Sequence, residues 1–534
     1  RDTDRSRGLG DVYKRQGRNA TIDGSTFITY AADSHTLYGA LKFIPAARHP
    51  KNSTMEIREW DTNKLLGHIP QVEYTYKVVG NMNEHQLSIT ESTWGGRPEL
   101  VDTTGIIDYG SLMYIALQRA KTAREAITVM TDLVSEYGYY SSGESFSIAD
   151  PEEVWIMEMI GKGPQNQGAV WVAVRIPDDC IAAHANQSRI HKFPLDDKEN
   201  CLYSPDVISF AREQGYFNGL NKDFSFADAY APADFGALRG CEARVWSFYN
   251  RFNSSMGKYL SYLNGKSKEY LPLYIKPDKK LSVQDMKDAM RDHFEGTPFD
   301  MTQDVGAGPF KCPYRFRPMT FKVDSVEYTN ERAVATQQTA FTLVAQMRSW
   351  LPNAIGGVLW FGVDDTNTCV YVPLYACLNE VPECYSELNG SMYDLSWTSA
   401  FWIHNWVANM SYSRYDQMIE DIRPVQKDIE TTFYVQQPVI EKVANDLYRN
   451  DPVAAIRFLN AYSVAQAQQT TVQWKKLGEF LLVKYLDGNR KKEKGGHFLE
   501  NGYGLPADPD FPGYSEEYYR AVAKDAGDRL KVAF

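Results

Sequence analysis

Apolar and polar positions follow one another in blocks, first with the period of a β-strand and then with that of a helix. Residues 26–33 and much of 71–89 are rich in β-branched and aromatic residues, which is typical of strands. Between 111 and 137 the apolar residues recur at helical spacing. We therefore expect a strand-rich beginning followed by two helices, over 111–120 and 124–137.

Strand patterns return in four later stretches, at 145–149, 154–160, 169–176 and 323–374. Helices and loops alternate between 204 and 296, and from about 411 onward the pattern is helical and more polar. Strands and helices thus occur in blocks, which favours antiparallel sheets covered by helices over a doubly wound parallel sheet. We predict an α+β fold, with a boundary near residue 410 that separates 17–410 from 411–534.

Composition excludes several classes of partner. The 534 residues carry a formal net charge of −11 and show no basic stripe, so nucleic acid is not an expected partner. No apolar run approaches the roughly 18–20 residues needed to span a bilayer, so no transmembrane segment is expected.

The chain has no signature of a metal or cofactor site. Its nine histidines are scattered, and His-Glu-x-x-His, Gly-x-Ser-x-Gly and phosphate-binding glycine motifs are absent. The adjacent pair Asp364-Asp365 is interpreted as a turn. The seven cysteines include no Cys-x-x-Cys pair and are expected to be buried free thiols: Cys180, Cys201, Cys241, Cys312, Cys369, Cys377 and Cys384.

Residues 1–16 differ in character from the rest of the chain. They contain no apolar stretch, so they are not a signal peptide. Eight of them are charged: Arg1, Asp2, Asp4, Arg5, Arg7, Asp11, Lys14 and Arg15. We expect this segment to be a translated adapter sequence that replaces the true N-terminus.

Eight long blocks of the sequence stand out along the chain: NATIDGSTFITYAADSH (19–35), GNMNEHQLSITEST (80–93), TAREAITVM (122–130), YGYYSSGESFSIADPEEVWIMEMIGKG (137–163), WVAVRIPDDCIAAHANQSRI (171–190), CEARVWSF (241–248), NAIGGVLWFGVDD (353–365) and SWTSAFWIHNWVAN (396–409). In this order they resemble the cysteine dipeptidases of the dipeptidase A and secernin type, and the resemblance covers the chain from 17 to about 480. These proteins are N-terminal-nucleophile hydrolases, related to choloylglycine hydrolase and penicillin V acylase.

The resemblance implies a fold and a setting for the chemistry. The fold would be a four-layer α/β/β/α sandwich with a helical C-terminal extension packed on it, and the substrate a small peptide, with no cofactor. Relatives that carry an export signal point to the cell envelope or periplasm. A homo-oligomer is compatible with the sequence, which does not define the oligomeric state or the compartment.

The implied reaction depends on the first residue of the mature chain. In this class an N-terminal Cys supplies the thiol nucleophile, and its own α-amine, with a pKa of about 8, acts as the base. Alignment without gaps from Gly17 places that Cys at Asp11, which cannot do thiol chemistry. All seven cysteines lie far along the chain, so none is expected to substitute, and we expect the chain as written to be inactive.

The resemblance also assigns roles to four residues. Asp33 takes the place of the carboxylate near the nucleophile, Asn186 that of the oxyanion-hole amide, and Arg244 that of a supporting arginine. Thr93 falls where a backbone N–H would complete the oxyanion hole. Where the acylases carry an arginine, this chain has Tyr30. From the residues alone, Asp33 and Asn186 could instead cap turns, and Arg244 could form a helix salt bridge.

Three further residues in the strongest blocks are candidates for supporting the site or binding a substrate amine: Asn83, Glu84 and Glu144. Two other functions stay open at this point. One is a catalytically dead binding protein on the same fold. The other is a glycan-processing hydrolase that uses paired carboxylates in an aromatic groove.

Overall fold

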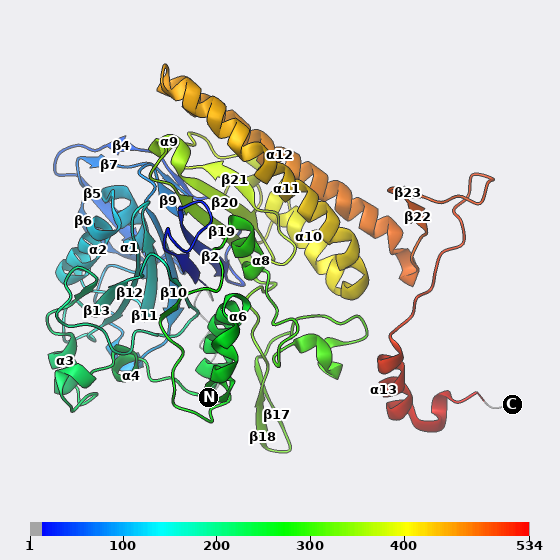
Figure 1. Cartoon of the computed structure of the whole chain (residues 1–534), viewed down its shortest axis with the longest axis horizontal. Coiled ribbons are helices and arrows are strands. Elements are labelled where there is room, and N and C mark those ends of the chain that lie inside the picture. Colours follow the sequence, from blue (N-terminus) through cyan, green and yellow to red (C-terminus); the bar gives the residue numbers. More distant parts are fainter. Residues whose placement is uncertain (1–12, 533–534) are drawn as a thin grey trace.

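Two antiparallel sheets form the centre of the protein in the computed structural model, which describes residues 13–532 (Figure 1). The seven-stranded sheet has the order β16 (Tyr274–Ile275), β14 (Ile181–His184), β1 (Tyr13–Gln16), β2 (Thr26–Asp33), β19 (Thr339–Met347), β20 (Val358–Val363) and β21 (Val372–Tyr375). The eight-stranded sheet has the order β15 (Cys201–Tyr203), β13 (Ala169–Arg175), β12 (Val154–Gly161), β11 (Gly143–Ala149), β10 (Ser88–Trp94), β9 (Met82–Asn83), β8 (Val78–Val79) and β3 (Phe43–Ile44).

The central strands are buried along their whole length. All eight residues of β2, all nine of β19 and all seven of β11 are buried. Because successive side chains of a strand point to opposite faces, such strands must be covered on both sides. One cover is the other sheet, since β2 contacts both β10 and β11. This confirms the expected α+β class and its antiparallel sheets.

Helices provide the second cover. Helices α1 (Tyr109–Arg119) and α2 (Ala123–Tyr137) contact β10 and β11, as the apolar spacing predicted. Helix α8 (Val283–Met290) contacts β2 and β19, and α6 (Ala243–Phe252) contacts β14. The shorter helices are α3 (Val207–Glu213), α4 (Phe226–Tyr230), α5 (Phe235–Ala237), α7 (Leu260–Leu263) and α9 (Asn353–Gly356).

The stretch 71–89 differs from its expected two strands. It contains only the two-residue strands β7 (Tyr74–Thr75), β8 and β9 before β10 begins. The cause is a tight turn in which the Asn83 side chain accepts hydrogen bonds from the backbone N–H groups of His85 and Leu87. An Asn that bonds to its own following backbone favours a turn over a strand.

Four two-stranded sheets complete the strands, and three of them are hairpins while β4 and β7 are separated by β5 and β6. They are β4 (Ala47–Arg48) with β7, β5 (Thr54–Arg58) with β6 (Leu65–Pro70), β17 (Thr320–Val323) with β18 (Val326–Thr329), and β22 (Glu493–Lys494) with β23 (His497–Phe498).

The C-terminal part is helical, as expected. Helix α10 (Ala400–Tyr412) runs through the boundary predicted near residue 410, so that boundary stays a prediction. Helices α11 (Tyr415–Tyr448) and α12 (Pro452–Lys484) pack against each other and contact β21. From 486 to 532, which includes α13 (Glu516–Ala526), no residue is buried, and Figure 1 shows this segment running away from the body. Within residues 13–532, no helix combines the length and apolar character that crossing a membrane requires.

A buried ion pair ties α11 to the body. Arg291, just after α8, donates two hydrogen bonds to the Glu430 carboxylate, at 2.6 and 3.1 Å. The same carboxylate accepts the backbone N–H of Tyr371, next to β21. Both charged side chains are at most 8% exposed, and Glu430 is the buried countercharge of Arg291, whose other partner, Asp288 at 3.5 Å, is exposed.

Glu430→Gln should therefore lower the free energy of unfolding by about 3 kcal/mol, because it leaves the buried Arg291 guanidinium with only the exposed carboxylate of Asp288, 3.5 Å away, as its countercharge. Urea denaturation followed by circular dichroism measures this. Glu420→Gln, on the exposed face of the same helix, is the matched control and should change stability by less than about 0.5 kcal/mol. Equal effects of the two substitutions would contradict the role of the pair.

Candidate active site

Asp33 ends β2 and is buried among groups that favour its charge. Its Oδ1 accepts a hydrogen bond of 2.6 Å from Thr339 Oγ1, across the register of β2 and β19. The guanidinium of Arg332 lies 3.6 Å from its Oδ2. Burial nevertheless raises the pKa of Asp33 to about 6, against the lowering effect of Arg332, Thr339 and Arg244. Asp33 can therefore change its protonation state near neutral pH.

Asn186 follows β14 and connects the two sheets. Its Nδ2 donates a hydrogen bond of 2.7 Å to the carbonyl of Thr93 on β10, and its backbone N–H donates to Ser92 Oγ at 2.8 Å. Its Oδ1 accepts from Arg244 Nη2 at 2.9 Å. Asn186 also has a φ of 51°, a left-handed conformation that Asn tolerates better than most residues.

Arg244 lies on α6 with its side chain fully buried. Its Nε donates to the carbonyl of Gly240 at 2.7 Å, and Nη2 orients the Asn186 amide. Burial, together with the positive charge of Arg332, lowers the pKa of Arg244 to about 10. Two guanidinium groups, those of Arg332 and Arg244, thus act on Asp33.

Thr93 and Glu144 also lie at the candidate site, next to Asn186. Thr93 Oγ1 donates a hydrogen bond of 2.8 Å to Glu144 Oε2. The carbonyl of Thr93, rather than the N–H that the sequence pointed to, is the group that contacts Asn186. Beside them Tyr30 donates to Glu91 Oε1 at 2.8 Å. Arg332, Thr339 and Glu91 were not found by sequence reasoning, because no motif marks them and strand register or a loop brings them here.

Asn83 and Glu84 are not part of this group, contrary to their assignment from sequence. Asn83 lies beside Ser88, at the opposite end of β10 from Thr93. Its Nδ2 donates to the carbonyls of Leu117 and Ala120, so it closes the end of α1. Glu84 accepts the backbone N–H of Lys77. Both residues shape the turn before β10.

Strand β1 begins at this same end of the sheet. Tyr13 pairs with His184, two positions before Asn186, and Arg15 pairs with Ile28 on β2. Asp11, the position assigned to the nucleophile, lies outside the described residues. The first described residue of β1 is therefore at the end of the sheet that carries Asn186 and Asp33.

One cysteine lies against the site, although its distance along the chain gave no indication of this. Cys241 Sγ donates to the backbone carbonyl of Asn186 at 3.5 Å. Burial raises the pKa of its thiol, and it sits inside a helical turn, so it has no free α-amine. All seven cysteines are free thiols, and five are buried, as expected; Cys241 and Cys312 are half-buried.

Asp364 and Asp365 form a turn after β20, as predicted. Asp364 has a φ of 64°, and both side chains are buried. Asp365 accepts hydrogen bonds from the hydroxyls of Tyr314 and Tyr412. Between residues 13 and 532 no group of three or more His, Cys, Asp or Glu side chains is arranged to hold a metal ion.

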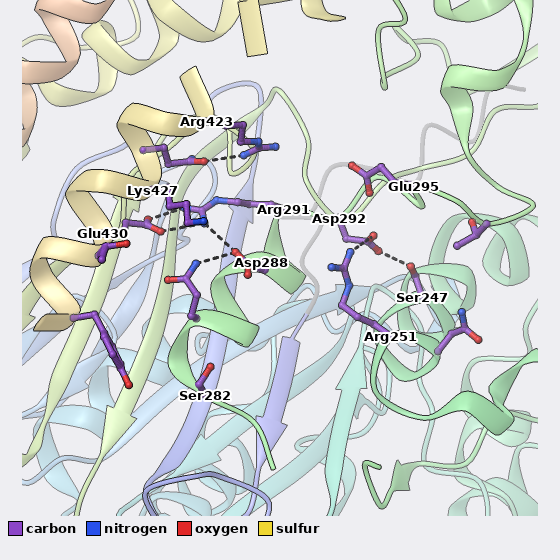
Figure 2. Close-up of a pocket in the computed structure, with 16 residues that line it drawn as sticks. Ser247, Arg251, Ser282, Asp288, Arg291, Asp292, Glu295, Arg423, Lys427 and Glu430 are labelled. Carbon is purple, nitrogen blue, oxygen red and sulfur yellow. Dashed lines mark hydrogen bonds and ion pairs between the residues drawn. The ribbon is translucent and has the colours of Figure 1, made fainter. Parts of the chain in front are cut away.

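A cavity of about 870 Å³ lies elsewhere, between α6, α8 and α11 (Figure 2). Its charges are largely paired with one another, as Arg291 with Glu430 and Arg251 with Asp292 at 2.8 Å. Ser247 on α6 lines it, one helical turn after Arg244. The cavity and the candidate site share this helix, but none of the candidate residues lines the cavity.

Comparisons with known proteins agree with this geometry. The model of peptidase family C69 matches residues 16–428. The chain is 27% identical over 418 residues to a probable dipeptidase of Latilactobacillus sakei, which covers 75% of this chain and 80% of that protein. It is 26% identical over 381 residues to a probable dipeptidase of Salmonella dublin, covering 67% and 79% of the two chains. It is 24% identical over 384 residues to a probable dipeptidase B of Streptococcus pyogenes serotype M1, covering 71% of each. The chain belongs to peptidase family C69.

Proposed function

We propose that this protein scaffold hydrolyses dipeptides through an N-terminal Cys, as a member of the N-terminal-nucleophile hydrolases. The observation that carries the proposal is the meeting of Asp33, Asn186, Arg244 and Thr93 at the end of the sheet where β1 begins. The names of the relatives support a dipeptide substrate.

The arrangement of layers supports the same class. The two sheets face each other through β2, β10 and β11, with α1 and α2 outside one sheet and α6 and α8 outside the other. We assign this to the four-layer α/β/β/α sandwich. In this assignment residues 17–410 form the catalytic domain and 411–534 its helical extension.

In the proposed reaction each group has one task. A Cys at position 11 attacks the peptide carbonyl, and its α-amine takes the thiol proton. The amine passes this proton to the leaving nitrogen as the C–N bond breaks, and water then hydrolyses the acyl-enzyme and frees the thiol. Asp33 orients that amine. The Asn186 amide nitrogen donates one hydrogen to the Thr93 carbonyl. In the transition state the same amide nitrogen donates its other hydrogen to the tetrahedral oxyanion. Arg244 fixes the Asn186 amide through its Oδ1.

The proposal predicts that activity depends on residue 11. Removal of residues 1–10 together with Asp11→Cys, so that the Cys is the first residue, should give hydrolysis of Ala-Ala, measured by release of free alanine. The same truncation with Asp11→Ala should give none. A folded Cys variant without turnover would contradict the dipeptidase proposal and favour a binding protein on the same scaffold.

Asn186 allows the oxyanion role to be separated from a structural one. In the active variant, Asn186→Gly and Asn186→Ala should each lower kcat by about 10²–10³-fold, because both lose the amide donor. Both variants should lose stability with the hydrogen bonds that the side chain makes to Thr93 and Arg244. Asn186→Ala should lose about 1 kcal/mol more than Asn186→Gly, since alanine resists the left-handed backbone at φ 51°. Kinetics and thermal unfolding of the pair measure the two effects. Retained kcat in Asn186→Gly would exclude the oxyanion role.

The raised pKa of Asp33 predicts how kcat/KM depends on pH. Because its pKa is raised to about 6, kcat/KM of the active variant should rise with pH through about 6 as the carboxylate forms. Asp33→Asn should remove this limb and lower kcat at least about 100-fold. Asp446→Asn, at an exposed position of α11, should leave the profile unchanged.

The raised pKa of Asp33 also makes the stability of the protein depend on pH. Native Asp33 keeps its proton to a higher pH than the unfolded chain, so its contribution to the free energy of unfolding falls as pH rises from about 4 to 6. Asp33→Asn should remove this part of the pH dependence in urea titrations. An unchanged dependence would show that Asp33 ionises normally in the fold.

A further inference from the structure

The cavity between α6, α8 and α11 has the size of a ligand-binding site. Its volume of about 870 Å³ lies within the range of about 300–1,000 Å³ that is typical of small-molecule sites. Charged side chains line it, four of each sign: Arg251, Arg291, Arg423, Lys427, Asp288, Asp292, Glu295 and Glu430. Because the lining carries both signs in equal number, it matches a ligand that also carries both better than a simple anion or cation.

Two of the four cations in the lining have no carboxylate partner. Arg291 and Arg251 are each paired with a carboxylate, at 2.6 and 2.8 Å. Arg423 and Lys427, in contrast, form no ion pair with any residue of 13–532. They are four residues apart on α11, so their side chains are neighbours on one face of the helix, which lines the cavity (Figure 2). This face therefore presents two uncompensated positive charges to the cavity.

The guanidinium of Arg423 is held in place and keeps one edge open. Its Nη1 donates to the carbonyl of Asn367 at 2.6 Å and to Gln426 Oε1 at 2.8 Å, and its Nη2 donates to Asn367 Oδ1. A guanidinium has five N–H donors, so Nε and the second hydrogen of Nη2 are left without partners in the described part of the chain. These two donors form one edge of the planar group, the edge that binds both oxygens of a carboxylate.

Negative charge faces the same cavity from α8 and from the loop that follows it. Asp288 on α8 accepts a hydrogen bond of 2.8 Å from Gln284 through Oδ1, whereas its Oδ2 has no hydrogen-bond partner among residues 13–532. Glu295, five residues after the end of α8, accepts the backbone N–H of His293 at 2.9 Å. The side chains of Asp288 and Glu295 are 54% and 51% exposed, so their oxygens can accept further hydrogen bonds from a ligand.

We propose that this cavity binds a free α-amino acid, with its carboxylate at Arg423 and Lys427 and its ammonium group at Asp288 and Glu295. The carboxylate accepts the two open N–H groups of Arg423 and one from the Lys427 ammonium. A free amino acid is zwitterionic near neutral pH, so it satisfies both sides of the cavity without adding net charge. The inference goes beyond the proposed function, because none of the candidate active-site residues lines this cavity.

Isothermal titration of the full chain tests the chemistry of the ligand. L-alanine carries both charges and little else, so it should bind with one site per chain. L-alaninamide lacks the carboxylate and propionate lacks the ammonium group, so each should bind at least about 10-fold more weakly. No binding of L-alanine, or equal affinity for L-alaninamide, would overturn the inference. Tighter binding of inorganic phosphate than of L-alanine would also overturn it, because the site would then be a simple anion site.

A charge reversal in the cavity tests its location. Lys427→Glu places a carboxylate one helical turn from the open edge of Arg423, where it competes with the ligand, so the affinity for L-alanine should fall at least about 10-fold. Position 427 is exposed, so thermal unfolding should be unchanged. Lys442→Glu, at an exposed position of α11 outside the cavity, is the matched control and should bind L-alanine normally. Unchanged affinity in Lys427→Glu would overturn the inference.

The candidate active site provides the remaining control. Asn186→Ala should retain the affinity for L-alanine, since Asn186 does not line the cavity. Loss of binding in Asn186→Ala together with normal binding in Lys427→Glu would place the amino acid at the candidate active site and contradict the inference. The titrations use the chain without an N-terminal Cys, so their outcome does not depend on whether the Asp11→Cys variant hydrolyses dipeptides.

Discussion

The side chain of Asn186 is the contact on which the candidate site depends, because it holds the two sheets in one relative position. Its amide reaches Thr93 in the eight-stranded sheet, while its backbone continues β14 of the seven-stranded sheet. Arg244 fixes the amide from α6. A slip of one residue in either sheet would turn the site-facing side chains to the opposite face. The geometry of the site is therefore set by how the sheets pack, and not by any single loop.

Charge is distributed unevenly around that contact. On one side, Arg332 and Arg244 act on the carboxylate of Asp33. On the other side, Glu91 lies beside Glu144, and burial raises the pKa of Glu91 to about 7. Because electrostatic effects are strong in a buried environment, a bound peptide experiences this difference along its length.

The sequence predicted the fold where periodicity was long and regular. Strand β2 and helices α1 and α2 were expected within a few residues of their observed bounds, because their apolar patterns are uninterrupted. The stretch 71–89 was not, since the side-chain hydrogen bonds of Asn83 break it into turns.

The site was predictable only in part. Asp33, Asn186 and Arg244 were found through the blocks that carry them. Arg332 was missed because it follows the exposed hairpin β17–β18 and reaches Asp33 only through the tertiary fold. Glu91 was missed because its position beside the site arises from a register that the sequence does not show.

Cys241 shows why proximity to the site does not by itself make a nucleophile. Its thiol lies next to Asn186 and two arginines, yet it donates its hydrogen to a backbone carbonyl, and burial keeps its pKa above the usual range. It lies inside a helical turn, where the backbone nitrogen is an amide and cannot act as a base. A thiol at the start of the chain would differ in both respects, because it carries its own amine and approaches Asp33 from the beginning of β1. The proposed mechanism therefore assigns the nucleophile to a residue before β1, even though another cysteine lies within contact of the proposed oxyanion donor.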